Sequence, residues 1–135
     1  MKILRQQTVV LIAALAFLIF SAGNASAQNP CHKFKRLTAP STVRGFIGGE
    51  SHDCYEIRAR KGQTMTIDIS WRREEDNRAE FSVSRSASFG GSPVSFGRRS
   101  NNDRHWTGKI PASRKYYIYV VAHPTARYTL KTRLK

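Results

Sequence analysis

Two clusters of side chains in this chain of 135 residues have the chemistry of a binding site. In the first, Cys31 is followed by His32, and His52 and Cys54 flank an aspartate. Two thiols and two imidazoles can bind zinc, whereas two cysteines alone can form a disulfide. Paired zinc ligands are ordinarily separated by about two to four residues, and neither pair has that spacing. These are the only two cysteines in the chain. The pattern favours a Cys31–Cys54 disulfide over a metal site.

The second cluster is basic and lies in the last third of the chain. It comprises Arg98, Arg99, Arg104 and His105, followed by Trp106. A guanidinium group can bind a phosphate or a carboxylate through two parallel hydrogen bonds. We therefore predict that these three arginines and His105 form a ligand-binding loop. The alternative is that the arginines only border a loop, where charge prevents edge-to-edge pairing of strands. For Trp106 itself we favour a place in the core.

The residues give little support for catalysis. The segment 90–93 contains two glycines and a serine, but Pro93 and the lack of a strand-to-helix context argue against a nucleophile elbow. Carboxylates are few, and Asp68 is expected on an outward strand face beside basic neighbours. A glycosidase would need two carboxyl groups facing each other across a cleft. We predict a non-enzymatic protein with no cofactor and no metal.

The first 27 residues have the pattern of a secretory signal peptide. Lys2 and Arg5 precede an apolar run over Val9–Phe20, and Ala25-Ser26-Ala27 is a small-residue cleavage site before Gln28. The apolar run has twelve residues, too few for a helix that must span a bilayer with about 20. We expect export to the periplasm or the medium, without stable membrane insertion. The rest divides into an extended lead at 28–41 and one domain at 42–135.

The charge of the chain is strongly positive. The full sequence carries +14, and the 108 residues after the leader hold 21 basic and 9 acidic side chains, or +12. Such an excess attracts anionic surfaces, although it also serves solubility alone. Outside the cytoplasm the candidate partners are an anionic polysaccharide, lipopolysaccharide or an exported protein, and nucleic acid is not favoured as a physiological partner. We expect a monomer.

Short alternating apolar segments separated by Gly, Pro, Asn and Asp predict the fold. This pattern is typical of an all-β sandwich or barrel, and about eight strands are enough for an antiparallel β-sandwich of two packed sheets. No segment after the leader has helical spacing. The expected strands are Val43–Ile47, Cys54–Ala59, Thr64–Trp71, Ala79–Arg85, a weak Val94–Gly97, His105–Ile110, Lys115–Ala122 and Ala126–Leu134. Alternation places one face of each strand inward. The predicted inward residues include Tyr55, Ile57, Ala59, Met65, Ile67, Ile69, Trp71, Phe81, Val83, Tyr116, Ile118, Val120, Tyr128 and Leu130.

Several of these segments also resemble a known family, the bacterial pre-peptidase C-terminal domain. The residues that carry the resemblance are Lys61-Gly62-Gln63 with the alternating strand after it, Trp106, Tyr116–Val120, and Tyr128-Thr129-Leu130. The chain departs from the family at Ser113-Arg114-Lys115, where a glycine turn is usual. The resemblance implies a small, jelly-roll-like β-sandwich without catalytic residues, and it raises a second function, regulation or inhibition of an exported peptidase.

Some members of that family bind calcium through acidic loop residues. Glu74, Glu75 and Asp76 would be the matching positions, but Arg72, Arg73 and Arg78 flank them. Calcium needs several uncompensated oxygen ligands, so we interpret this segment as a solvated turn with local ion pairs.

Overall fold

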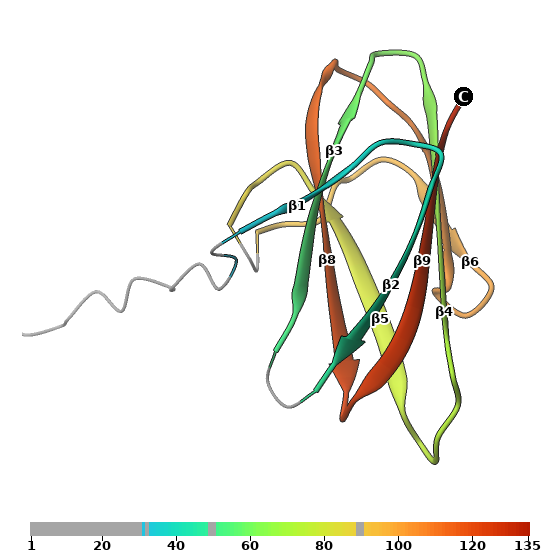
Figure 1. Ribbon diagram of the computed structural model, residues 1–135. Helices are drawn as coiled ribbons and strands as arrows, with labels where there is room; N and C mark the ends of the chain where they lie inside the picture. Colours follow the sequence, from blue (N-terminus) through green and yellow to red (C-terminus); the bar gives the residue numbers. More distant parts are fainter. Residues whose placement is uncertain (1–30, 32, 49–50, 89–90) are drawn as a thin grey trace, which may run out of the picture.

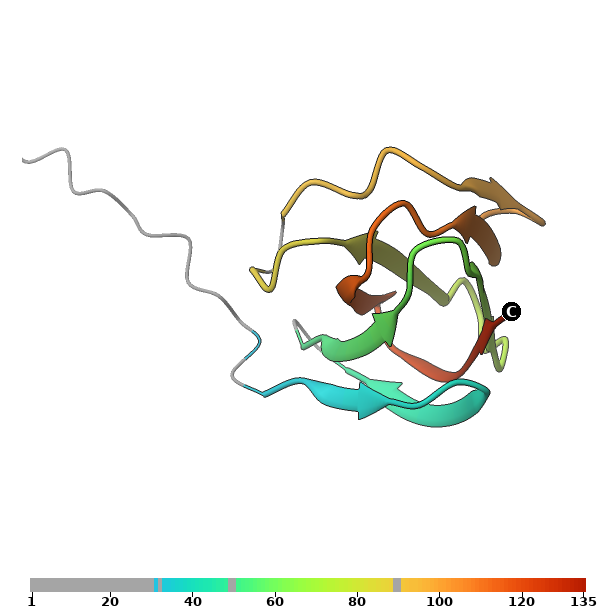
Figure 2. The same ribbon diagram turned by 90° about the horizontal axis from the view of Figure 1, so that it is seen from above.

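The computed structural model describes residues 31, 33–48, 51–88 and 91–135. The predicted leader and His32 lie outside the described residues. The described residues form nine strands in two sheets, and they contain no helix that could cross a membrane. The sheets lie face to face as two layers (Figure 1), and Figure 2 shows the strands from above, arranged around a shared interior. The predicted all-β sandwich is confirmed.

The smaller sheet has four strands in the order β1-β3-β8-β5. Its strands are β1 (Lys35–Leu37), β3 (Asp53–Ala59), β8 (Arg114–His123) and β5 (Arg78–Ser84). The larger sheet has the order β2-β9-β4-β7-β6. Its strands are β2 (Ser41–Ile47), β9 (Ala126–Leu134), β4 (Thr64–Trp71), β7 (His105–Lys109) and β6 (Arg98–Ser100). All pairs are antiparallel except β1 with β3.

Seven of the eight predicted segments are strands, and two of them, β4 and β9, have the predicted bounds. The predicted strand Val94–Gly97 is wrong, because these residues form no strand. The isolated bridge of this region pairs the preceding Pro93 with Ser84, and the Val94 amide donates to the Val83 carbonyl at 2.9 Å. Two edge strands of three residues each, β1 and β6, were not predicted. Both are mostly charged, so neither shows the apolar alternation that identifies a half-buried strand.

The core consists of the inward-facing residues of both sheets. The predicted inward residues are buried, except that Trp71 is partly buried at the end of β4. Trp106 is 4% exposed and belongs to this core, as predicted. Two glycines make room for its indole ring, since a Cβ atom would lie 2.5 Å from the ring at Gly97 and 2.7 Å from it at Gly108. Gly97 also has a φ of +92°, which favours glycine.

A buried polar network joins the two sheets. The Tyr128 hydroxyl donates to the Asp53 carboxylate, and the Tyr55 hydroxyl therefore donates to the oxygen of Tyr128. Lys35 completes the network from β1 with an ion pair to Asp53 at 3.1 Å. Both tyrosines are only 2% exposed, and burial raises the pKa of each above its ordinary value of 10.0. The neutral hydroxyls are thus the form that the folded state favours.

This network predicts a loss of stability at high pH. A tyrosine whose pKa is raised by folding stabilises the protein fully below pH 10 and loses that contribution as the pH rises toward the folded-state value. We expect the free energy of unfolding to fall above pH 10 by up to about 1.4 kcal/mol per pH unit for each buried tyrosine. Urea unfolding of the parent and of Tyr128→Phe between pH 8 and 11 measures this slope. A slope in the variant as steep as that of the parent would contradict the prediction.

Candidate functional site: a basic groove on the larger sheet

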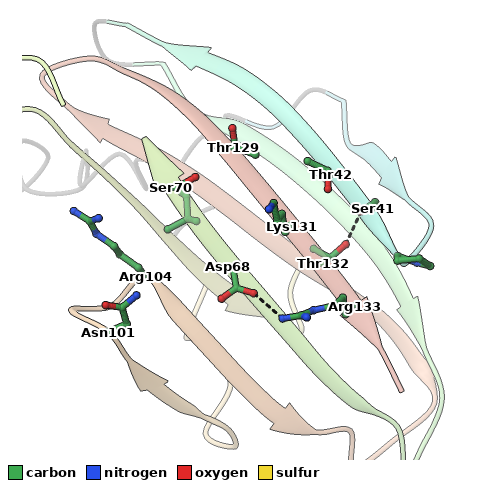
Figure 3. A pocket seen from close by; sticks show the side chains of 12 residues that line it. Ser41, Thr42, Asp68, Ser70, Asn101, Arg104, Thr129, Lys131, Thr132 and Arg133 are labelled. Atoms are coloured by element: carbon green, nitrogen blue, oxygen red, sulfur yellow. Dashed lines mark hydrogen bonds and ion pairs between the residues drawn. The ribbon is translucent and has the colours of Figure 1, made fainter. Parts of the chain in front are cut away.

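The outer face of the larger sheet is polar, and it contains a groove lined by several charged side chains. Alternation along β4 and β9 puts their polar residues on this face, and the register places Asp68 between Lys131 on β9 and His105 on β7. A groove of about 540 Å³ lies here (Figure 3), which we call the Asp68 groove. The lining of this groove includes the side chains of Asp68, Ser70, Arg104, Lys131 and Arg133.

Asp68 is the one acidic residue in the lining of this groove, and its two oxygens have separate partners. His105 Nδ1 lies 2.6 Å from Oδ1, and the Arg133 guanidinium donates to Oδ2 at 3.1 Å. The side chains of Asp68 and Arg133 are 35% and 56% exposed, so water screens the pair and it contributes little to stability. Lys131 and Arg104 add two further positive charges to the lining. The groove is therefore net positive.

Arg104 is positioned by an unusual turn between β6 and β7. Asn101, Asn102 and Asp103 all have positive φ angles, of 53°, 50° and 63°. Asn and Asp tolerate this left-handed backbone better than other residues that have a side chain. The Arg104 amide donates to the Asn101 carbonyl at 3.1 Å, and the guanidinium lies 4.0 Å from the centre of the Trp71 ring. Figure 3 shows Asn101 and Arg104 on the side of the groove away from Arg133.

The four predicted ligand-binding residues do not all lie together. Arg104 lines the Asp68 groove, and His105 bonds to the carboxylate in it. Arg99 points to the smaller sheet, where its guanidinium donates to the Phe81 carbonyl at 2.6 Å and lies 4.8 Å from the centre of the Phe81 ring. Arg98 is exposed on the edge strand β6, opposite Thr107, and remains a prediction for the border of the binding surface.

Sequence reasoning missed three residues of this groove. Asp68 was expected only as an outward residue beside basic neighbours, and Lys131 and Arg133 were not assigned to any site. The signal that connects them is their common outward position on two strands. That these strands are neighbours in the sheet could be seen only in the structure.

The predicted disulfide between Cys31 and Cys54 is confirmed. It ties the segment before β1 to β3 and packs with Phe34, Tyr117 and Tyr119 on the outer face of the smaller sheet. The Cys31 and Cys54 sulfurs and a His52 nitrogen lie within 4.8 Å of one another. Because the disulfide uses both thiols, this form of the protein offers no thiolate to a metal ion.

The acidic turn after β4 is held by local bonds, as expected. The Arg72 guanidinium pairs with Glu74 at 3.4 Å, and the Asn77 side chain accepts from the Glu74 amide at 2.9 Å and donates to the Arg72 carbonyl at 2.9 Å. The backbone carbonyl of Asn77 in this turn accepts a hydrogen bond from the indole N–H of Trp71 at 3.1 Å. The turn therefore supports the ring against which Arg104 lies.

The groove combines a histidine–aspartate pair with several cationic side chains. A histidine held by an aspartate is part of many hydrolytic sites, but such a site also needs a nucleophile bonded to the histidine. Among the described residues, no hydroxyl or thiol hydrogen-bonds to His105. The groove contains guanidinium and ammonium groups, which can donate hydrogen bonds to carboxylates, and several hydroxyl groups also line it.

Comparison with known proteins gives the fold a context. No protein-family profile matches the sequence, and no curated protein sequence matches it significantly. Several solved structures are similar in fold. PliG from Aeromonas hydrophila, a periplasmic inhibitor of g-type lysozyme, has a TM-score of 0.62 at 23% identity, over 76% of this chain and 96% of its own. PliG from Salmonella Typhimurium, also such an inhibitor, has a TM-score of 0.53 at 22% identity, over 76% and 99%.

The third structure is the pre-peptidase C-terminal domain of a Bacillus anthracis collagenase. Its TM-score is 0.56 at 18% identity, over 75% of this chain and 95% of its own. The resemblance to that domain noted in the sequence therefore extends to the fold. All three identities lie below 25%, so what these proteins share with the chain is the β-sandwich architecture.

Proposed function

We propose that this protein is exported and non-enzymatic, and that it inhibits a cell-wall glycosidase of the lysozyme type by binding it through the outer face of the larger sheet. The observation that carries the proposal is the net positive Asp68 groove on a fold shared with two lysozyme inhibitors. The predicted leader and the Cys31–Cys54 disulfide agree with an oxidising compartment outside the cytoplasm.

The charge of the groove suits such a target. Most glycosidases use two carboxyl groups that flank the bond they cleave, so the substrate cleft is acidic. A surface that presents Arg104, Lys131 and Arg133 complements an acidic cleft, and complementary charge speeds encounter and selects the partner. The side chains of the groove can thus bind where the substrate would.

A second candidate is regulation of an exported peptidase. It is favoured by the fold shared with the pre-peptidase C-terminal domain of a collagenase. The two candidates differ in target enzyme, so a parallel assay with a collagenase and a g-type lysozyme separates them.

We expect the protein at residues 28–135 to slow the lysis of a bacterial cell suspension by g-type lysozyme. Replacing Arg104, Lys131 and Arg133 together with alanine should raise the concentration needed for half-inhibition about tenfold or more, because each removes a positive charge from the contact. The matched control replaces Arg36, Arg58 and Lys61 with alanine, and these substitutions remove the same total charge from other exposed positions. Equal inhibition by the two triple variants would show that the groove is not the contact.

A polysaccharide ligand would behave differently from a protein. Binding to a polyanion through Arg and Lys weakens steeply with salt, whereas a protein contact with an apolar centre keeps much of its affinity. Retention on a heparin column, measured against salt for the parent and for an Arg98/Arg104 double alanine variant, tests whether these arginines bind an anionic polysaccharide. Arg99 is kept in this variant because it joins the two sheets.

A further inference from the structure

Phe46 is the one large apolar side chain that is exposed among the described residues, at 57%. It lies on the outer face of β2, the edge strand of the larger sheet, directly opposite Arg127 on β9. Single exposed apolar residues are common on protein surfaces, so the case for a contact at Phe46 depends on the residues around it.

The ring of Phe46 is held in place by its neighbours. The Arg127 guanidinium lies 5.2 Å from the centre of the ring, within the range of a cation–π contact. A Cβ atom on Gly48 would lie 3.0 Å from the ring, so the ring rests against the backbone there. An aromatic side chain that is already ordered loses little conformational entropy on binding, which increases its contribution to affinity.

Around Phe46 lies a second groove of about 550 Å³, which we call the Phe46 groove. Its lining includes Arg44, Arg72 and Arg127 and has no acidic residue. It shares Ser70 and Thr129 with the Asp68 groove. The two grooves therefore form one continuous surface, apolar and cationic at the Phe46 end and polar at the other.

The charges at this surface define what it can accept. Arg72 is paired with Glu74, although both side chains are well exposed and the pair is weak, and the guanidinium groups of Arg44 and Arg127 border the ring. Energetically dominant contact positions in protein interfaces are enriched in arginine and large aromatic residues at the centre of the contact. A ligand that matches both features must bring carboxylates together with an apolar side chain.

We propose that the Phe46 groove is the docking site for an acidic segment of the partner protein that presents one apolar side chain between carboxylates. The apolar side chain would pack on the Phe46 ring, and the carboxylates would pair with Arg44 and Arg127. This inference rests on the proposed binding function and adds the chemistry of the partner and the location of the contact. An anionic polysaccharide lacks the apolar side chain, so it would bind the arginines without depending on the Phe46 ring.

The test uses a fluorescent heptapeptide with one phenylalanine flanked by glutamates, and two comparison peptides. In one of these, glutamine replaces every glutamate, and in the other, alanine replaces the phenylalanine. We expect the parent protein to bind the first peptide most tightly, by fluorescence anisotropy, and expect Phe46→Ala to weaken that binding about tenfold. Arg44→Ala/Arg127→Ala should weaken it similarly, whereas Thr107→Ala, on the same face at β7, should leave it unchanged.

Amide chemical shifts measured with the peptide provide the location. Perturbations gathered at 42–48, 70–72 and 126–129 support the proposal, since these segments border the Phe46 groove. Absence of binding at millimolar peptide, an affinity indifferent to Phe46→Ala, or shifts confined to the smaller sheet would each overturn it. Binding of heparin with an affinity unchanged in Phe46→Ala, together with no peptide binding, would assign the surface to a polyanion.

The same variants separate this inference from the proposed inhibition. If the parent inhibits g-type lysozyme and Phe46→Ala inhibits equally well, the proposed function stands and the docking site is wrong. If the parent does not inhibit lysozyme but binds the peptide in the Phe46 groove, the enzyme target is wrong and the docking site stands.

Discussion

Replacing Trp106 with alanine is expected to lower the free energy of unfolding by about 3–5 kcal/mol, the usual cost of removing a buried aromatic ring. The indole is 4% exposed and fills the space above Gly97 and Gly108, where no Cβ atom can take its place. It also makes an edge contact with Phe96, whose ring centre lies 5.9 Å away. The backbone around it cannot collapse easily, because β7, which carries Trp106, is paired with β4 on one side and β6 on the other.

Urea unfolding followed by circular dichroism measures this loss. Phe46→Ala is the matched control, since it removes an aromatic ring from the same sheet at a position 57% exposed, and it should change stability by less than about 0.5 kcal/mol. A domain of this size has a total stability of about 5–15 kcal/mol, so this loss is a substantial part of the total. If the two variants had the same stability, Trp106 would not be a core residue.

Removing the disulfide should have the second largest effect. The double replacement Cys31→Ser/Cys54→Ser opens a closure over a sequence separation of 23 residues, which is expected to cost about 3 kcal/mol through the entropy of the unfolded chain. The disulfide is buried beside Tyr119, whose hydroxyl donates to the Ser86 carbonyl at 2.6 Å. Burial raises the pKa of Tyr119 to about 12. Loosening the segment before β1 should therefore expose this aromatic cluster as well.

The measurement is thermal unfolding of the parent, oxidised and reduced, beside the double serine variant. The reduced parent and the variant should both unfold several degrees below the oxidised parent. A midpoint in the variant equal to that of the oxidised parent would mean that the bond contributes nothing to stability. If the midpoint is lower in the variant but unchanged in the reduced parent, the loss is caused by the serine side chains and not by the missing bond.

The parts of the fold that sequence reasoning found are those that depend on local patterning. In β4, Met65, Ile67 and Ile69 alternate with polar residues, and this alternation is the direct consequence of one buried face. The disulfide was predictable for a different reason, because two cysteines in a chain with a leader leave few alternatives. Trp106 was assigned correctly to the core from the resemblance to the pre-peptidase C-terminal domain.

The groove could not be found in the same way because its residues meet through long-range register. Asp68 lies opposite Lys131 only because β4 and β9 are neighbours, 63 positions apart in the sequence. Strand order is decided by how the whole sandwich closes, and no local pattern records it. The turn at Asn101–Asp103 shows the same limit, since its left-handed backbone is allowed by the residue types but is required only by the connection from β6 to β7.

The central claim is that the outer face of the larger sheet binds the partner protein, and a charge-reversal experiment tests it most directly. One variant replaces Arg104, Lys131 and Arg133 with glutamate, and a second replaces Arg36, Arg58 and Lys61, so that both change the net charge by the same amount. Binding of g-type lysozyme by surface plasmon resonance should be lost in the first and retained within about threefold in the second. Equal binding by both variants, or loss only in the second, would contradict the account.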